Sequence, residues 1–266
     1  MDDSEPVKPS QVSKELLHRY IDGCHILHHY GLVDAYGHLS VRLSASTFLM
    51  SRYLAPALVA SVGDLVIYRI KDGQPVAAES PRGFSERFIH SEIYKAYQGV
   101  QAVVHSHSLD VVPFSISATP LQACFHMAGF LGTAVPIWDA ASVYKDHPAD
   151  NQDMLVKNVK LGSALARSLG CNGGQAMGIP KHPVVLMRGH GFVATAQSLE
   201  MVIFNSIYTA QNARVQREAI SLGTEIQVFN EREAHDTGST TGQGAVKPWP
   251  LWVNEVSNES IYKNLV

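Results

Sequence analysis

Apolar residues recur every three or four positions in several long segments, which is the spacing of one face of an α-helix. A glycine closes three of these segments, as expected at a helix C-terminus. Serine begins two of them and suits the N-cap position there. The pattern predicts long helices over residues 11–30, 85–97, 152–170 and 198–223, and a short helix over 108–118.

Shorter runs, in which apolar residues cluster or alternate with polar ones, predict β-strands between these helices. The predicted strands cover residues 38–43, 47–51, 64–70, 101–107 and 133–139, and two more lie within 182–196 on either side of a glycine-flanked turn. Strands and helices alternate unevenly. We therefore expect an α/β fold whose sheet is mixed or largely antiparallel, with helices on its faces.

The two ends of the chain differ from this pattern. Residues 1–10 are polar and predict a flexible lead-in, whereas residues 224–266 are polar and rich in glycine. We expect that C-terminal segment to wrap over the surface or over a neighbouring subunit. No internal repeat or linker interrupts the chain, so residues 1–266 are predicted to form a single domain.

Composition narrows the class of protein. The chain has 266 residues, of which 45% are hydrophobic and 17% charged, and its formal net charge is −3. It has no basic excess for nucleic acid, and no apolar run reaches the roughly 18 residues of a membrane span. Its acidic, polar N-terminus does not resemble a signal sequence. The three cysteines are widely separated and odd in number, so we expect free thiols and a cytoplasmic location.

Two of the 13 histidines stand one residue apart in the segment "QAVVHSHSLD". Alternation along a strand places His105 and His107 on the same face, about 6.5 Å apart. From there both imidazoles could reach one metal ion with bonds of roughly 2.1 Å. The alternative is a strand whose polar outer face happens to carry histidines.

Two further residues extend this candidate metal site. His190 stands between two glycines at the end of a later strand, where the backbone can turn sharply. Glu86 opens the helix that precedes the histidine strand. Three neutral imidazoles would leave an open position on a divalent ion, and a carboxylate could be a fourth ligand or a base. The simpler interpretations are a loop histidine and an acidic residue that favours a helix start.

Three blocks of the sequence resemble the class II aldolase/adducin family. They are "GHLSVRL", "FSERFIHSEIYKAYQGVQAVVHSHS" and "RGHGFVATAQSLEMV", and they follow the family's order over roughly residues 15–220. The resemblance implies a three-layer α/β/α sandwich with a predominantly antiparallel central sheet. It also implies one divalent ion per chain, zinc or manganese, held by His105, His107 and His190, with Glu86 as ligand or acid/base. Iron stays open.

The chain departs from the family where its sugar-phosphate aldolases bind phosphate. A histidine, His38, replaces the family's asparagine, Arg52 and Tyr53 replace a small hydroxyl–glycine pair, and only Ser85 remains of a serine pair. Phosphate favours small hydroxyls and backbone N–H groups, whereas an arginine fork suits a planar carboxylate. We therefore expect an unphosphorylated substrate whose carboxylate is held by Arg52 with His38 nearby.

This substituted pattern is similar to the family branch that decarboxylates hydroxylated aromatic or pyridine dicarboxylates. It favours a metal-dependent carbon–carbon lyase acting on a small-molecule hydroxy-carboxylate. Arg82 could also grip the carboxylate, and His126 could donate a proton, although a solvated loop arginine and a core histidine are the alternatives. By resemblance we expect a homo-oligomer, a tetramer, with the site near a subunit boundary.

Other functions remain open at this point. The same site could perform aldol cleavage of a sugar-like substrate, epimerisation through retro-aldol chemistry, or iron-dependent oxidative cleavage. From a different class, the adducin branch uses the fold as a binding module without a metal. The three histidines and Glu86 argue against that alternative, and the metal content of the purified protein would separate the two.

Overall fold

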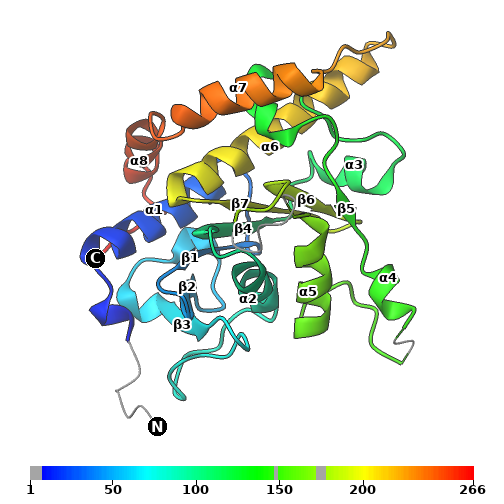
Figure 1. The fold of residues 1–266 in the computed structure, drawn as a ribbon. Coiled ribbons are helices and arrows are strands. Elements are labelled where there is room, and N and C mark those ends of the chain that lie inside the picture. Colours follow the sequence, from blue (N-terminus) through cyan, green and yellow to red (C-terminus); the bar gives the residue numbers. More distant parts are fainter. Residues whose placement is uncertain (1–7, 147–148, 172–177) are drawn as a thin grey trace.

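The structure is a computed structural model that describes residues 8–146, 149–171 and 178–266. Within these residues a seven-stranded sheet runs in the order β3-β2-β1-β4-β7-β6-β5 (Figure 1). Neighbouring strands are antiparallel except for β5 and β6, which are parallel. The strands are β1 (His38–Arg42), β2 (Thr47–Ser51), β3 (Leu65–Arg69), β4 (Ala102–Ser106), β5 (Ile137–Trp138), β6 (Val184–Met187) and β7 (Gly191–Ala196).

Helices cover both faces of the sheet, which gives three layers (Figure 1). One face carries α1 (Lys14–His29), α6 (Leu199–Ser221), α7 (Glu231–Gln243) and α8 (Trp249–Ser257). The other carries α2 (Arg87–Ala96) and α5 (Val159–Ser168), which pack against each other. Short elements join these layers: η1 (Pro9–Gln11), η2 (Pro56–Leu58), η3 (Val62–Asp64), α3 (Val112–Ile116), η4 (His126–Leu131) and α4 (Ala141–Tyr144).

Alternation along the strands divides the buried residues into two cores. In β4, Ala102 and Val104 belong to the core beneath α1 and α6, whereas Val103 belongs to the core beneath α2 and α5. His105 follows the alternation of Val103 and therefore lies on the α2 side of the sheet. The predicted α/β fold with a mainly antiparallel sheet is confirmed.

The helix predicted over residues 152–170 is shorter than expected. It begins only at Val159, because the side chain of Asn158 accepts a hydrogen bond from the Leu161 N–H and caps the helix there. Upstream, Met154 has a positive φ of 67°, which interrupts any helix. The apolar spacing continued through this loop because Val156 is buried over the start of α2.

The segment after residue 224 is largely helical rather than an irregular tail. Asn230 and Glu233 form a capping box that begins α7. This helix crosses η4 where Gly129 and Gly238 meet, so the two backbones approach closely. Trp252 of α8 is buried against α1. Polar composition concealed α7, because small residues rather than large apolar ones make its contact with η4.

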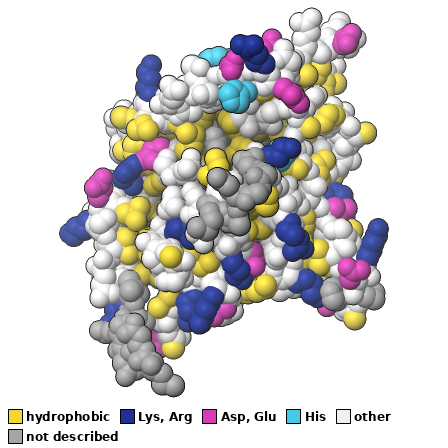
Figure 2. All heavy atoms as spheres, in the orientation of Figure 1, with side chains coloured by type: hydrophobic (Ala, Val, Ile, Leu, Met, Phe, Trp, Pro, Cys, Tyr) yellow, Lys and Arg dark blue, Asp and Glu magenta, His cyan; other side chains and the backbone are white. Residues whose placement is uncertain are grey.

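The lead-in predicted for residues 1–10 lies mostly outside the described residues, and its end enters η1. None of the helices in the described ranges is both long and apolar enough to span a membrane. On the face drawn in Figure 2, acidic and basic side chains are scattered among uncharged ones.

Candidate active site

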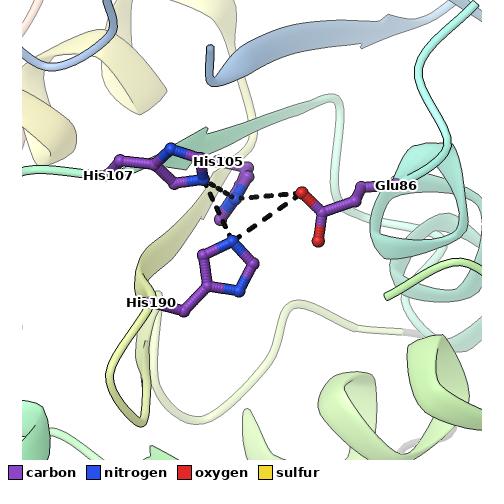
Figure 3. A group of neighbouring side chains, drawn as sticks. All are labelled: Glu86, His105, His107 and His190. Carbon is purple, nitrogen blue, oxygen red and sulfur yellow. Dashed lines mark hydrogen bonds and ion pairs between the residues drawn. The ribbon is translucent and has the colours of Figure 1, made fainter. Parts of the chain in front are cut away.

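Four side chains converge near the C-terminal end of the central strand β4, on the α2 side of the sheet. They are Glu86, His105, His107 and His190, which we call the histidine–glutamate cluster (Figure 3). One ligand atom from each lies within 4.8 Å of all the others. The four residues that the sequence predicted to form a site therefore meet in space.

Strand β4, the β6–β7 turn and the start of α2, where Glu86 is the N-cap residue, bring these four residues together. His105 is the fourth residue of β4 and His107 follows the strand, while His190 occupies the turn between β6 and β7. Strand β7 pairs with β4, so this turn lies beside His107. A Cβ at Gly191 would collide with the Ser106 carbonyl oxygen, which explains why a glycine stands there.

The spacing of the donor atoms fits one metal ion. The Nε2 atom of His107 lies 3.0 Å from the Nε2 atoms of both His105 and His190. The Oε2 atom of Glu86 lies 3.6 Å from the His105 Nε2 and 3.8 Å from the His190 Nε2. Donor atoms at right angles on bonds of roughly 2.1 Å are about 3.0 Å apart, so the nitrogens could share one ion.

The protonation states also suit a metal. The Phe192 carbonyl oxygen lies 3.2 Å from the His105 Nδ1 and can only accept, so Nδ1 carries the proton and Nε2 offers a lone pair. Burial lowers the pKa of His105, His107 and His190, which favours the neutral ring that binds metal.

Glu86 combines a fixed orientation with a perturbed acidity. Its Oε1 accepts a hydrogen bond from the Val156 N–H at 3.0 Å, which leaves Oε2 turned toward the histidines. Burial raises the pKa of this carboxyl, and the neighbouring His190 opposes that shift. A carboxyl of this kind is suited to holding and releasing a proton.

His38 lies directly beside the cluster. It pairs with His105 across β1 and β4, and the two ring centroids are 5.1 Å apart. On its other side the ring of Phe84 lies 4.7 Å away. Of the residues predicted to bind substrate, His38 is thus the one in contact with the cluster.

The other predicted substrate residues lie farther out. Arg52 pairs through Nε with the Asp64 carboxylate at 2.9 Å, and its backbone forms a bridge with Gly83. Arg82 and Ser85 are exposed. His126 is exposed at the start of η4, and within the described residues it makes no hydrogen bond or ring contact with the histidine–glutamate cluster.

Aromatic side chains near the cluster were not assigned a role from the sequence. The ring of Tyr53 packs on Phe84 at 5.4 Å, and the Arg82 guanidinium lies 4.6 Å from the Tyr53 ring centroid. The exposed Tyr36 lies 6.4 Å from the His107 ring. Tyr36 directly precedes one quoted motif, Phe84 is the first residue of another, and Tyr53 follows Arg52, and these positions were the available sequence signal.

Comparison with known sequences gives one family. A sequence model described as the Class II Aldolase and Adducin N-terminal domain matches residues 18–217. Decarboxylase tropJ from Talaromyces stipitatus is 43% identical, over 92% of this chain and 96% of that protein. A 3,4-dihydroxyphthalate decarboxylase from Arthrobacter keyseri is 27% identical, over 75% of this chain and 77% of its own length.

Solved structures share the fold at lower identity. An L-fuculose 1-phosphate aldolase from Glaciozyma antarctica has a TM-score of 0.67 and 21% identity, covering 94% of this chain and 92% of its own. An aldolase II superfamily protein from Pseudomonas syringae has a TM-score of 0.69 and 18% identity, with coverage of 95% and 97%. These likenesses concern the architecture.

Proposed function

The chain belongs to the class II aldolase and adducin family, and we propose that it is a divalent-metal-dependent carbon–carbon lyase that decarboxylates an unphosphorylated hydroxy-carboxylate. The observation that carries this proposal is the convergence of three Nε2 atoms, from the buried His105 and the half-buried His107 and His190, beside the Glu86 carboxylate. A binding module has no need for such a set of neutral ligands. The similarity to named decarboxylases favours decarboxylation over aldol cleavage.

In this proposal His105, His107 and His190 hold one divalent ion, with zinc or manganese as the first candidates and iron as a further one. When bound there, the ion supplies a Lewis acid for the negative charge that develops as the carbon–carbon bond breaks. Glu86 is either the fourth ligand or the acid/base, and its orientation by Val156 supports both roles.

The chain's own residues account for the rest of the reaction. Carbon dioxide leaves, the bonding electron pair remains on the substrate carbon, and a proton must reach that carbon. Glu86 is suited to deliver this proton because burial raises the pKa of its carboxyl group. His126 is the alternative donor, and its exposed position in η4 would suit a site completed by a neighbouring subunit.

Substrate recognition is assigned to the side of the cluster where His38 lies. The ring contacts from His38 through Phe84 to Tyr53 form an aromatic wall, and Arg82 lies over its outer end. Such a wall favours a flat, aromatic hydroxy-carboxylate. Arg52 is the proposed carboxylate fork; its Nε is held by Asp64, which orients the remaining guanidinium nitrogens. Ser85 is assigned a minor contact with the substrate.

We extend the proposal to the assembly and its setting. A homotetramer with the site near a subunit boundary is expected, as is a cytoplasmic location. Sedimentation at micromolar concentration tests the first expectation, because a monomer would contradict it.

The activity is tested by a substrate screen. The purified enzyme, loaded in turn with manganese and zinc, is incubated with hydroxy-aromatic and pyridine carboxylates and, separately, with sugar phosphates. Carbon dioxide release and aldehyde formation are both followed. We expect carbon dioxide from at least one carboxylate and no aldehyde from any sugar phosphate.

Two results would contradict this expectation, and each would indicate a different function. Aldehyde from a sugar phosphate, with no turnover of any carboxylate, would make the protein an aldolase. A protein that binds no stoichiometric transition metal would instead support the adducin-like binding module. A Glu86→Gln preparation run in parallel excludes carbon dioxide produced by contaminating enzymes.

A further inference from the structure

A continuous line of hydrogen bonds leads away from the histidine–glutamate cluster into the core. The Nδ1 atom of His38 lies 2.7 Å from the Nε2 atom of His90. The other nitrogen of His90, Nδ1, lies 2.6 Å from the Ser40 hydroxyl, which lies 2.8 Å from the Tyr94 hydroxyl. We call these four side chains the buried hydrogen-bond chain. None of them is more than 2% exposed.

The far end of this chain sets its direction. The Tyr94 hydroxyl has no partner other than Ser40 in the part of the protein that the structure describes. If the Tyr94 hydroxyl accepted a hydrogen bond from the Ser40 hydroxyl, its own hydrogen would be buried without an acceptor. An unsatisfied buried donor costs roughly 1–3 kcal/mol. Tyr94 therefore donates to Ser40.

Each following bond takes its direction from the one before. The Ser40 hydroxyl, which accepts from Tyr94, donates its own hydrogen to the Nδ1 of His90. Complete burial lowers the pKa of His90 to about 3, so its ring is neutral and carries its one hydrogen on Nε2. That hydrogen is donated to the Nδ1 of His38.

His38 is the last member of the chain, and its ring lies beside the histidine–glutamate cluster. With Nδ1 accepting from His90, its single hydrogen must be on Nε2. No side chain or carbonyl in the described residues bonds to this Nε2 atom, which is not sealed from solvent. The ring lies against His105 and Phe84, where the substrate was proposed to bind.

We propose that Tyr94, Ser40 and His90 are positioning residues that hold His38 in one tautomer, so that its Nε2–H donates a hydrogen bond to an oxygen of the substrate. The inference rests on the proposed function only for the identity of that oxygen. A carboxylate or a developing enolate oxygen accepts such a bond, whereas the other tautomer would turn a lone pair toward it.

The tautomer is measured by solid-state ¹⁵N NMR of histidine-labelled full-length protein, with zinc and without metal. A His38→Asn sample identifies the His38 signals by their loss, and a His90→Asn sample does the same for His90. Nitrogens that carry hydrogen resonate far from those that do not. We expect hydrogen on Nε2 of both rings, and hydrogen on Nδ1 of either ring would overturn the proposal.

Variants test the link between the chain and the substrate. Glutamine at position 90 offers an oxygen to Ser40 and an amide N–H to His38, so His90→Gln should retain the tautomer. His90→Leu removes the donor and should give a mixture of tautomers. Tyr97→Phe controls for a general disturbance of the core next to α2. Tyr97 is buried there, but its hydroxyl donates to the Ala166 carbonyl and takes no part in the buried hydrogen-bond chain.

Kinetics on the metal-loaded variants supply the second readout. We expect His90→Leu to raise KM for the carboxylate substrate and lower kcat, together about 10–100-fold in kcat/KM, with an unchanged metal content. His90→Gln should recover most of this loss. Equal losses in His90→Leu and His90→Gln would reduce His90 to a packing role and contradict the proposal. If the protein is an aldolase, the proposed function fails, but the NMR measurement still tests the His38 tautomer independently.

Discussion

Two groups of buried or half-buried histidines lie next to each other in this protein, and their ring nitrogens have different partners. In the histidine–glutamate cluster, three rings turn their Nε2 atoms toward a common point beside Glu86. In the buried hydrogen-bond chain, each inward ring nitrogen is matched by a donor or an acceptor. Burial lowers the pKa of histidines in both groups. What the ring nitrogens face, not burial, therefore separates a candidate ligand from a structural histidine.

The largest expected effect comes from removing one member of the cluster. His107→Ala deletes the ring whose Nε2 lies between those of His105 and His190. We expect elemental analysis to fall from about one ion per chain to almost none. Turnover should fall at least about 1000-fold, because a metal stabilises the transition state by several kcal/mol.

The buried hydrogen-bond chain offers the matched comparison. His90→Gln also changes a fully buried histidine, only one ring away from the cluster, and should leave the metal content unchanged. Full metal content in His107→Ala, or loss of metal in His90→Gln, would remove the distinction between the two groups.

A smaller effect is expected when only the charge of the cluster is changed. Glu86→Gln keeps the side-chain oxygen that accepts from the Val156 N–H but cannot exchange a proton. Turnover should fall about 100- to 10,000-fold, the usual contribution of a general acid or base. The thermal unfolding temperature should change little. Wild-type turnover in this variant would exclude Glu86 from proton transfer.

The two groups also differ in how far the sequence alone could predict them. The cluster was predicted because alternation within one strand put His105 and His107 on one face, and flanking glycines singled out His190. Helical spacing could place His90 inside the protein. Its partner depends on how α2 docks on β1, which joins residues about 50 positions apart. No local pattern encodes that docking.

The same limit applies to residues that the sequence assigned to substrate binding. Replacement of the small phosphate-binding residues drew attention to Arg52, and this inference concerned residue type alone. The structure adds that Asp64, 12 positions later, occupies one edge of the guanidinium. The loop that carries Met154 and Val156 was missed because its apolar spacing imitates a helix while its backbone turns over Glu86.

Ser40→Ala should have a moderate effect on stability. It leaves the His90 Nδ1 and the Tyr94 hydroxyl without partners in the core, at a cost of about 1–3 kcal/mol in the free energy of unfolding. Ser91→Ala is the control, because Ser91 is equally buried and its hydroxyl has no hydrogen-bond partner among the described residues. Urea unfolding at fixed protein concentration measures both. Equal effects of the two variants would show that the chain contributes nothing to stability.

The smallest expected effect is the contribution of His90 to the pH dependence of stability. The pKa of His90 is lowered by burial to about 3 in the folded protein and is about 6.5 in the unfolded chain. Below pH 6.5, His90 therefore binds a proton in the unfolded chain but not in the folded protein. The contribution of His90 to stability is complete above that pH and is lost as the pH falls toward 3.

Between pH 8 and pH 6, proton binding by this one histidine in the unfolded chain lowers the free energy of unfolding by about 1 kcal/mol. His90 faces His38, Ser40 and Tyr94, and no carboxylate pairs with its ring within the described residues, so none offsets the shift. The free energy of unfolding of metal-free protein should fall by about 1 kcal/mol more in the wild type than in His90→Gln over this interval. Parallel pH profiles would mean that the folded ring accepts a proton. Because the directed chain of hydrogen bonds requires a neutral His90, such a result would also remove the physical basis for a fixed His38 tautomer.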